Sequence, residues 1–134
     1  MKRVLFFLTV LAILLSVFSC KKDIPVSTSL VGTWELSEDI NGMTGQATHH
    51  KSGNDTIAKF SATGYEFYQK GKLVKSGTYS IKQDTFSLSN QVKNRIIWDN
   101  EENSLRDFFD IENNQLTLFI DAYDAPSVIY RRIK

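Results

Sequence analysis

The feature of this sequence that most constrains its fold is the alternation of apolar and polar residues along most of its length. From residue 30 onward, short stretches carry an apolar side chain at every second position, and no stretch has the period of an amphipathic helix. In the first of them, Leu30, Trp34 and Leu36 lie on one face of an extended chain. Turn-forming residues follow at short intervals, as in Lys70-Gly71-Lys72 and Asn113-Asn114. These signals predict an all-β domain of about eight or nine short antiparallel strands.

The expected strands follow one another through short turns, which is the order of an up-and-down meander. We expect strands within residues 30–36, 56–61, 65–68, 73–82, 86–88, 95–98, 105–111, 116–120 and 127–134. The one long connection spans residues 39–55. Full closure of such a meander removes the exposed strand edges that would otherwise promote aggregation. We therefore expect residues 30–134 to form a single antiparallel β-barrel of about eight strands, rather than a sandwich.

The N-terminus has the three parts of a secretory signal peptide. Lys2 and Arg3 form a cationic start, and residues 4–17 are apolar apart from two hydroxyl residues. Lys21 and Lys22 end this run before it reaches the roughly 20 apolar residues that a membrane-spanning helix needs. We expect residues 1–19 to be a signal peptide, and the alternative is an uncleaved anchor helix. Cys20 is the only cysteine of the 134 residues, so no internal disulfide can form.

Val17-Phe18-Ser19-Cys20 resembles the lipobox of bacterial lipoproteins. The resemblance implies that Cys20 carries a diacylglycerol thioether, that cleavage occurs before it, and that its freed amine is acylated. Several acyl chains, such as palmitate, hold a protein lastingly on a membrane. Residues 20–29 then form a short tether, and Ser-Cys-Lys-Lys-Asp with such a tether resembles lipoproteins of the Bacteroidota. The implied location is the cell envelope, in the first place the outer membrane, with the periplasmic or surface face left open.

Gly32-x-Trp34, followed by a long connection, resembles the start of a lipocalin. Phe60-x-x-x-Gly64-Tyr65, Gly71, the stretch 76–81 and the final Tyr130-Arg131-Arg132-Ile133-Lys134 are similar to bacterial lipocalin-like lipoprotein domains. The likeness covers residues 30–134. It implies an eight-stranded barrel with one closed end and a ligand entry at the other end.

The lipocalin resemblance also implies roles for particular residues. Trp34 would lie at the closed end, where an arginine of the last strand packs over its ring. Arg131 shares a face with Ile129 and Ile133, so we expect Arg131 rather than Arg132 to be that partner; the alternative is that both arginines are ordinary surface residues. The connection 39–55 would act as a lid over the entry, with Gly42, Met43 and Gly45 giving it mobility. A solvated loop without function is the alternative.

Several function classes find little support in the sequence. The formal net charge of +1 provides no basic face for nucleic acid. We expect no enzyme, because no nucleophile elbow, phosphate loop or dinucleotide fingerprint is present. We expect no metal and no cofactor: His49 and His50 would point to opposite faces of a strand, and the calcium-loop-like segment 99–110 has Ser104 where a glycine is needed.

Two functions from different classes remain. The first is the binding of a small apolar ligand inside the barrel, which an apolar cavity of roughly 300 Å³ or more would favour. The second is a protein-interaction, inhibitor or envelope-assembly role for a barrel that is packed solid. For the second, Ile97, Phe108 and Phe119 are candidates, because they alternate with the residues expected inside and would form an outward apolar patch.

Overall fold

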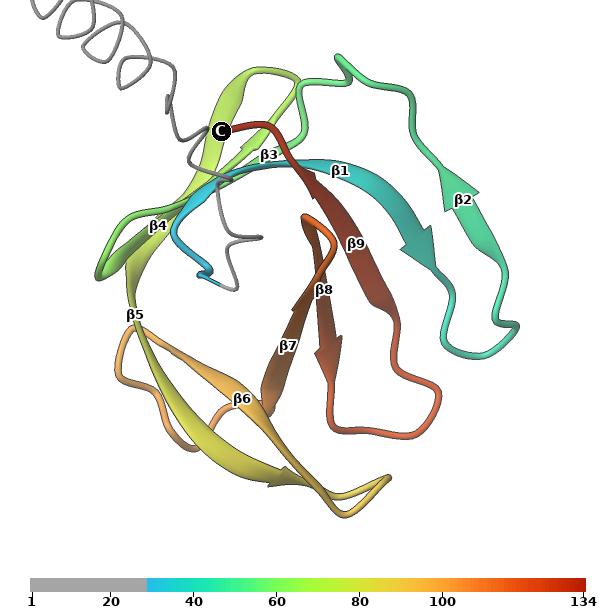
Figure 1. Ribbon diagram of the computed structural model, residues 1–134, viewed down its shortest axis with the longest axis vertical. Helices are drawn as coiled ribbons and strands as arrows, with labels where there is room; N and C mark the ends of the chain where they lie inside the picture. The colour runs from blue at the N-terminus through green and yellow to red at the C-terminus, as the bar shows by residue number, and fades with distance from the viewer. Residues whose placement is uncertain (1–28) are drawn as a thin grey trace, which may run out of the picture.

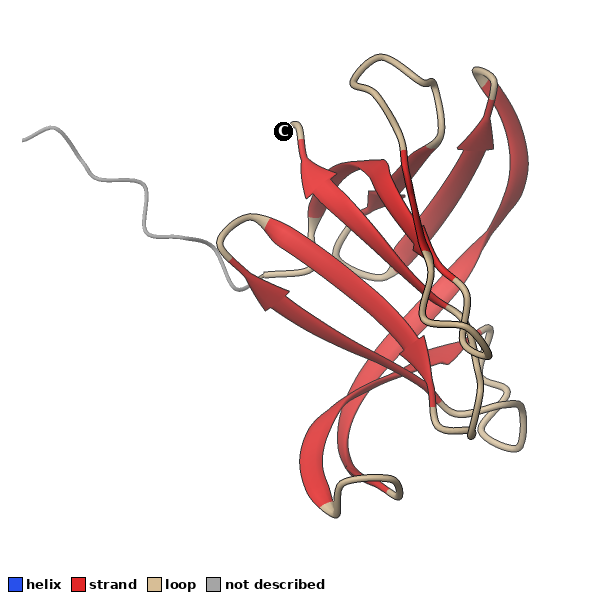
Figure 2. Ribbon diagram, turned by 90° about the vertical axis from the view of Figure 1, so that its right-hand side faces the viewer, coloured by secondary structure: helices blue, strands red, loops and turns tan. Residues whose placement is uncertain are grey.

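The computed structural model describes residues 29–134, which form an all-β domain without a helix in that range (Figures 1 and 2). The strands are β1 (Gly32–Ile40), β2 (Ala47–His49), β3 (Ile57–Phe60), β4 (Gly64–Gln69), β5 (Lys72–Phe86), β6 (Gln91–Trp98), β7 (Asp107–Glu112), β8 (Gln115–Ile120) and β9 (Ser127–Arg132). The expected signal peptide, Cys20 and all of the tether but Ser29 lie outside the described residues.

Eight of the strands close into an antiparallel barrel, as the sequence predicted. The order is β1-β3-β4-β5-β6-β7-β8-β9, and β9 returns to pair with β1 from Trp34 to Ile40. The ninth strand, β2, pairs with the end of β1 next to the β1–β3 pairing. The expected long connection therefore contains a strand of its own. Its apolar and polar residues gave no alternation from which this short strand could be recognised.

Two of the tight turns follow directly from their residues. Lys70 and Gly71 join β4 to β5 with φ angles of 51° and 73°, and Asn113 and Asn114 join β7 to β8 with φ angles of 50° and 62°. Two consecutive residues with positive φ are the mark of the two-residue hairpin turn whose twist matches that of the flanking strands. Gly and Asn adopt this conformation at the lowest cost, which is why both turns were predictable.

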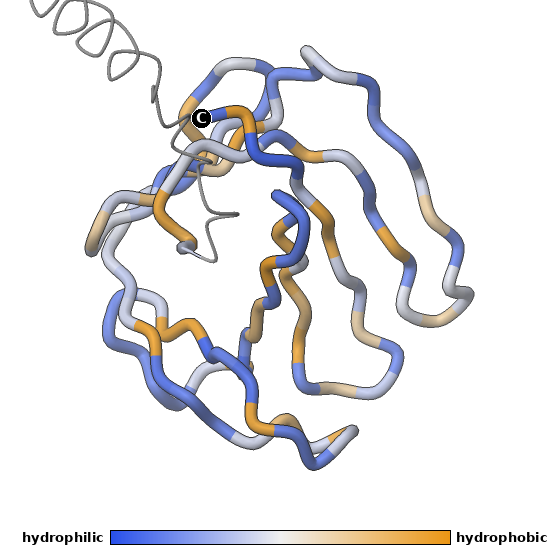
Figure 3. Tube along the Cα trace, viewed as in Figure 1, coloured by the Kyte–Doolittle hydropathy of each residue, from blue (hydrophilic) through white to orange (hydrophobic). Residues whose placement is uncertain are grey.

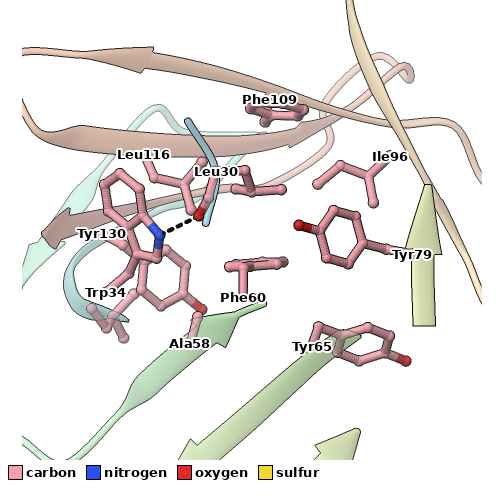
Figure 4. Packing of buried hydrophobic residues seen from close by; sticks show 11 residues of the cluster. Leu30, Trp34, Ala58, Phe60, Tyr65, Tyr79, Ile96, Phe109, Leu116 and Tyr130 are labelled. Carbon is pink, nitrogen blue, oxygen red and sulfur yellow. Dashed lines mark hydrogen bonds between the residues drawn. The ribbon is translucent and has the colours of Figure 1, made fainter. Parts of the chain in front are cut away.

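The interior of the barrel is packed with side chains from most of its strands. A cluster of eleven buried residues fills it (Figure 4): Leu30, Trp34, Leu36, Ala58, Phe60, Tyr65, Tyr79, Ile96, Phe109, Leu116 and Tyr130. Figure 3 shows how apolar and polar residues intersperse along the strands that supply it. Burying one large apolar side chain contributes roughly 1.5–3 kcal/mol, so this cluster is the main source of stability in a domain without disulfides.

One strand is longer than expected. The sequence predicted separate strands at 73–82 and 86–88, but β5 runs without interruption from Lys72 to Phe86. It pairs with β4 in its first half and with β6 in its second half. The polar residues 82–85 suggested a break, yet their main-chain groups continue the ladder with β6.

The second half of the β5–β6 hairpin lies against the outward face of β7 and β8. The ring of Phe86 is 5.3 Å from that of Phe108 and 5.2 Å from that of Phe119. Phe108 is 0% exposed and Phe119 is half-buried; Ile97, on the same outward face, is 5% exposed. The expected exposed patch of Ile97, Phe108 and Phe119 is therefore wrong. These residues do face outward, but Phe86 packs its ring on Phe108 and Phe119, and the three rings form a second, smaller cluster.

Candidate functional site

The closed end of the barrel is built around Trp34. Its side chain is fully buried, and its Nε1 donates a hydrogen bond of 2.9 Å to the carbonyl of Leu30 (Figure 4). The guanidinium of Arg132 lies 4.1 Å from the centroid of the indole ring, within range for a cation–π interaction. The N-terminal residues Ser29 and Val31 accept hydrogen bonds from the same guanidinium through their carbonyls. Ring, arginine and entering chain together cover this end.

The stacking partner of Trp34 is Arg132, so the expectation of Arg131 is wrong. Arg132 pairs directly with Trp34 across the β1–β9 ladder and shares its face, whereas Arg131 pairs with Glu35 on the opposite face. The inward residue of β9 is Tyr130, which is buried, and not Ile129. Ile133 lies beyond the end of β9 and is 45% exposed, so its apolar side chain does not mark the inward face of that strand.

Arg131 has a different role, on the outer face of β1. Its Nε donates to Glu35 Oε2 over 3.0 Å, and its Nη2 donates to the carbonyl of His50 over 3.0 Å. The other carboxylate oxygen of Glu35 accepts hydrogen bonds from the main-chain N–H of Gly53 at 2.7 Å and of Asn54 at 3.2 Å. These hydrogen bonds hold residues 50–54, which we call the outer strap, against β1, and they leave Glu35 only 5% exposed.

The residues expected to form a lid lie in the turn between β1 and β2, at the end of β1 away from Trp34. Asn41 Oδ1 accepts hydrogen bonds from the N–H of Met43 and of Thr44. Gly42 packs so closely on the connection 121–126 that an added Cβ would lie 2.2 Å from the carbonyl oxygen of Asp124. Met43 is 82% exposed, and Gly45 has a φ of 68° with open space around it. A lid role for this turn stays a prediction.

The end of the barrel opposite Trp34, which we call the open end, is lined by half-buried apolar side chains. Phe67, Trp98, Leu118 and Val128 pack on the core from this side without being covered. Beside Leu118, Ile120 and Val128 lies an open apolar depression of about 230 Å³. This volume is below the roughly 300–1,000 Å³ of most small-molecule sites, and its walls Leu118 and Val128 pack directly on the core cluster.

A single carboxyl group, that of Asp107, borders this depression. Its Oδ2 accepts a hydrogen bond of 2.7 Å from Trp98 Nε1. Burial raises the pKa of Asp107 above its ordinary value, against the opposing effects of the Trp98 hydrogen bond and of the charges on Lys75 and Arg95. The ammonium of Lys75 lies 6.0 Å from the centroid of the Trp98 ring. These groups can orient a polar atom of a bound molecule.

The acidic and histidine residues weighed for metal binding are engaged elsewhere. Within residues 29–134, no group of three or more His, Cys, Asp or Glu side chains is placed to hold a metal ion. His49 contacts Glu38 at 3.3 Å, and His50 contacts Asp39 at 2.7 Å, so each histidine meets its own acid on β1. In the calcium-loop-like segment, Asp99 accepts hydrogen bonds from Tyr65 and from the N–H of Thr78, and Asp110 pairs with Lys93.

Comparisons of the chain with protein-family models, with curated proteins and with solved structures gave no match. Among the residues that the structure describes, there is no helix long and apolar enough to cross a membrane.

Proposed function

We propose that this protein is a lipid-anchored interaction module of the cell envelope, whose barrel is a solid scaffold that binds another protein. The observation that carries the proposal is the packed interior. Trp34, Ala58 and Leu116 are fully buried, and aromatic rings fill the space between β3, β4, β5 and β6. A barrel of this strand number either packs its interior or holds one ligand, and here side chains take that space.

The anchoring part of the proposal rests on the sequence. The lipobox-like residues 17–20 and the signal-peptide pattern before them support an acylated Cys20. The described domain begins at Ser29, whose carbonyl accepts a hydrogen bond from Arg132 at the closed end. A tether joined at this point would enter the domain at the closed end. The open end and the distal β5–β6 hairpin would then be available to a partner.

A second function, the binding of a small apolar molecule at the open end, has one observation in its favour. The depression of about 230 Å³ combines apolar walls with the half-buried carboxyl of Asp107, which is the usual composition of a small-molecule site. Its size admits only a small ligand or one end of a larger one. We therefore rank this function below protein binding.

Native mass spectrometry of the full-length protein, extracted from its own membranes in detergent, separates the two. We expect a mass that matches the acylated chain without a small-molecule adduct, together with a stoichiometric complex with a second protein. A stoichiometric small adduct would overturn the proposal if Val128→Trp, which fills the depression, abolishes it. Ile129→Trp is the matched control, because the neighbouring residue of β9 faces outward.

A further inference from the structure

The closure of the barrel leaves part of the long strand β5 with an edge that has no partner strand in the described domain. β5 pairs with β4 from Lys72 to Thr78 and with β6 from Tyr79 to Phe86. Along Tyr79 to Phe86, the edge on the β4 side therefore has no neighbouring strand among residues 29–134. Figure 1 shows β5 and β6 continuing past β4 as a two-stranded hairpin. We call this side of the hairpin the β5 edge.

The direction of the main-chain groups at this edge follows from two hydrogen bonds. Thr78 accepts through its carbonyl from Asp99 N, and Tyr79 N donates to the carbonyl of Thr63. Main-chain groups alternate in direction along a strand, so the groups of residues 79, 81, 83 and 85 point to the β5 edge. The N–H of Thr85 donates to Asp84 Oδ1, and its carbonyl accepts from Arg106. This leaves the N–H and C=O of Ile81 and Gln83 without a partner within the described domain.

A groove of about 440 Å³ runs beside this edge. Its walls include Ser29, Leu30, Val31, Ile81, Asn94 and Phe109, so the groove borders the N-terminal residues of the described domain. Ile81 was expected to share the inward face of Tyr79, and it does, but it borders the groove and is 46% exposed. The groove therefore offers apolar side chains next to unpaired main-chain donors and acceptors.

The charges that usually protect a strand edge face away from it. Exposed edges are commonly blunted by charged side chains, by proline or by a bulge. Lys82 and Asp84 project to the other face, where Lys82 pairs with Glu102 at 3.2 Å and Asp84 pairs with Arg95 at 3.1 Å. Gln83 and Ile81 are neutral, and β5 pairs with β6 without a register shift. The edge is therefore open to another strand.

We propose that an extended segment of a partner protein adds to the β5 edge as a further strand. A polypeptide backbone is the ligand that satisfies donors and acceptors repeating every two residues, and its alternate side chains supply specificity. An apolar side chain of the partner fits the groove at Ile81 and Phe109. Because Arg106 ends the edge at Thr85, the paired stretch is short, about four or five residues. This inference rests on the proposed function, because it names the partner class and the surface for protein binding.

The test uses a phage-displayed library of random dodecapeptides, selected on the full-length chain in detergent. Enriched peptides are synthesised, and their affinity is measured by fluorescence polarisation for three proteins: the unchanged chain, Gln83→Pro and Gln83→Ala. Proline removes the N–H that points to the β5 edge and leaves the N–H groups of Lys82 and Asp84, which point to β6. We expect Gln83→Pro to weaken binding by about tenfold or more and Gln83→Ala to leave it within about twofold.

Each other outcome of this experiment contradicts the inference in a distinguishable way. Equal peptide affinity for all three proteins overturns the inference. If Val128→Trp then weakens the binding of the same peptides, the proposed protein binding stands, at the open end, and only its assignment to the β5 edge is wrong. If the protein forms a concentration-dependent dimer and Gln83→Pro abolishes it, the strand that binds the β5 edge comes from a second copy of this chain. If the peptides bind only after residues 21–28 are deleted, the edge is occupied by that segment of the same chain. The absence of any enriched peptide also overturns it. If Gln83→Pro fails to fold by circular dichroism, Ile81→Lys, which puts a charge on the edge, must give the same loss.

Discussion

Arg131 and Arg132 are neighbours with unrelated roles, because successive residues of a strand face opposite sides of a sheet. Arg132 stacks on Trp34 at the closed end, and Arg131 binds Glu35 and the outer strap. Glu35 is almost fully buried, a position that a carboxylate takes only with partners, and three groups provide them. No sequence signal marked Glu35 as a buried residue, since its partners lie up to 96 residues away in the chain.

The pairing of Trp34 with Arg132 can be measured in a chain that lacks residues 1–19 and carries Cys20→Ser. Trp34→Ala should cost about 3–5 kcal/mol in the free energy of unfolding, because it removes a large buried aromatic side chain. Arg132→Ala should cost about 0.5–2 kcal/mol. The two losses should not add in a double-mutant cycle by urea unfolding, because removal of the indole removes the surface on which the guanidinium stacks. Coupling of Trp34 to Arg131 in place of Arg132 would contradict the assignment.

Asp107 makes the stability of the domain depend on pH. Its pKa is raised in the folded state by burial, so the neutral carboxyl is favoured by folding. The stability that this group contributes is full below its ordinary pKa of 3.8 and is lost as the pH rises through the raised folded value. Asp107→Asn, which keeps an acceptor for Trp98 Nε1, should remove this loss. Urea unfolding between pH 3.5 and 7, in steps of about half a unit, should therefore show that the stability of Asp107→Asn relative to the unchanged chain rises with pH; a difference that does not vary with pH would rule out this role.

Two elements of the fold are held on the outside of the barrel. The outer strap lies over β1, and the distal β5–β6 hairpin lies over β7 and β8. In the second case, the Asp121 carboxylate binds Ser87 of the hairpin turn and Arg106, which also reaches Asp84 and the carbonyl of Thr85. Each element is thus held by buried contacts together with ion pairs. The sequence predicted a loop for residues 50–54 and separate strands at 73–82, 86–88 and 95–98 for the hairpin, but it did not predict that either element packs on the outside of the barrel.

The outer strap should loosen when Arg131 is replaced. Arg131→Ala leaves the buried Glu35 without its cationic partner, and we expect a loss of about 1–3 kcal/mol in the free energy of unfolding. The main-chain N–H of Gly53, which Glu35 binds, should exchange with solvent faster in NMR hydrogen-exchange measurements. Lys51→Ala is the control, because Lys51 lies in the same segment but is exposed. Equal exchange rates in both variants would show that Arg131 does not hold the segment.

The packing of the distal β5–β6 hairpin on β7 and β8 should depend on Phe86. Phe86→Ala removes the ring that packs on Phe108 and Phe119, and because Phe86 is half-buried we expect a cost of about 1–3 kcal/mol. Apolar surface would be uncovered on β7 and β8, so fluorescence of a hydrophobic dye should rise. Leu88→Ala, in the same hairpin turn and 40% exposed, should be nearly neutral. A neutral Phe86→Ala without added dye binding would mean that other contacts hold the hairpin.

At the scale of the whole molecule, the proposal divides the chain into an N-terminal targeting and anchoring segment and a folded scaffold. The described residues account for the scaffold, whose closed end receives the N-terminal residues Ser29 to Val31. The open end and the β5 edge are the surfaces that we propose for the binding of another molecule. A packed core gives these surfaces a rigid support, because protein interiors have the density of organic crystals.

The proposed lipid anchor is tested by Cys20→Ala in the full chain, produced in a bacterium with the lipoprotein pathway. The variant should lose labelling by an alkyne-tagged palmitate and accumulate as the uncleaved precursor, because the implied processing requires a lipidated cysteine. Phe18→Ala keeps the cysteine and should still be labelled. Normal processing and membrane retention of Cys20→Ala would contradict the lipoprotein proposal.

The sequence determined the fold class, the position of most strands and the tight turns at Lys70-Gly71 and Asn113-Asn114. These features depend on residues a few positions apart, and alternation and turn chemistry report them directly. Tertiary structure decided which arginine meets Trp34, because that depends on the β1–β9 register and on the shift between Leu36 and Glu38. Tertiary structure also decided that Ile97 and Phe108 are buried, that the interior is packed and that β5 extends beyond the end of β4. Each of these depends on contacts between distant segments, and the local pattern of apolar residues is the same whether a face is covered by water, by a ligand or by another part of the chain.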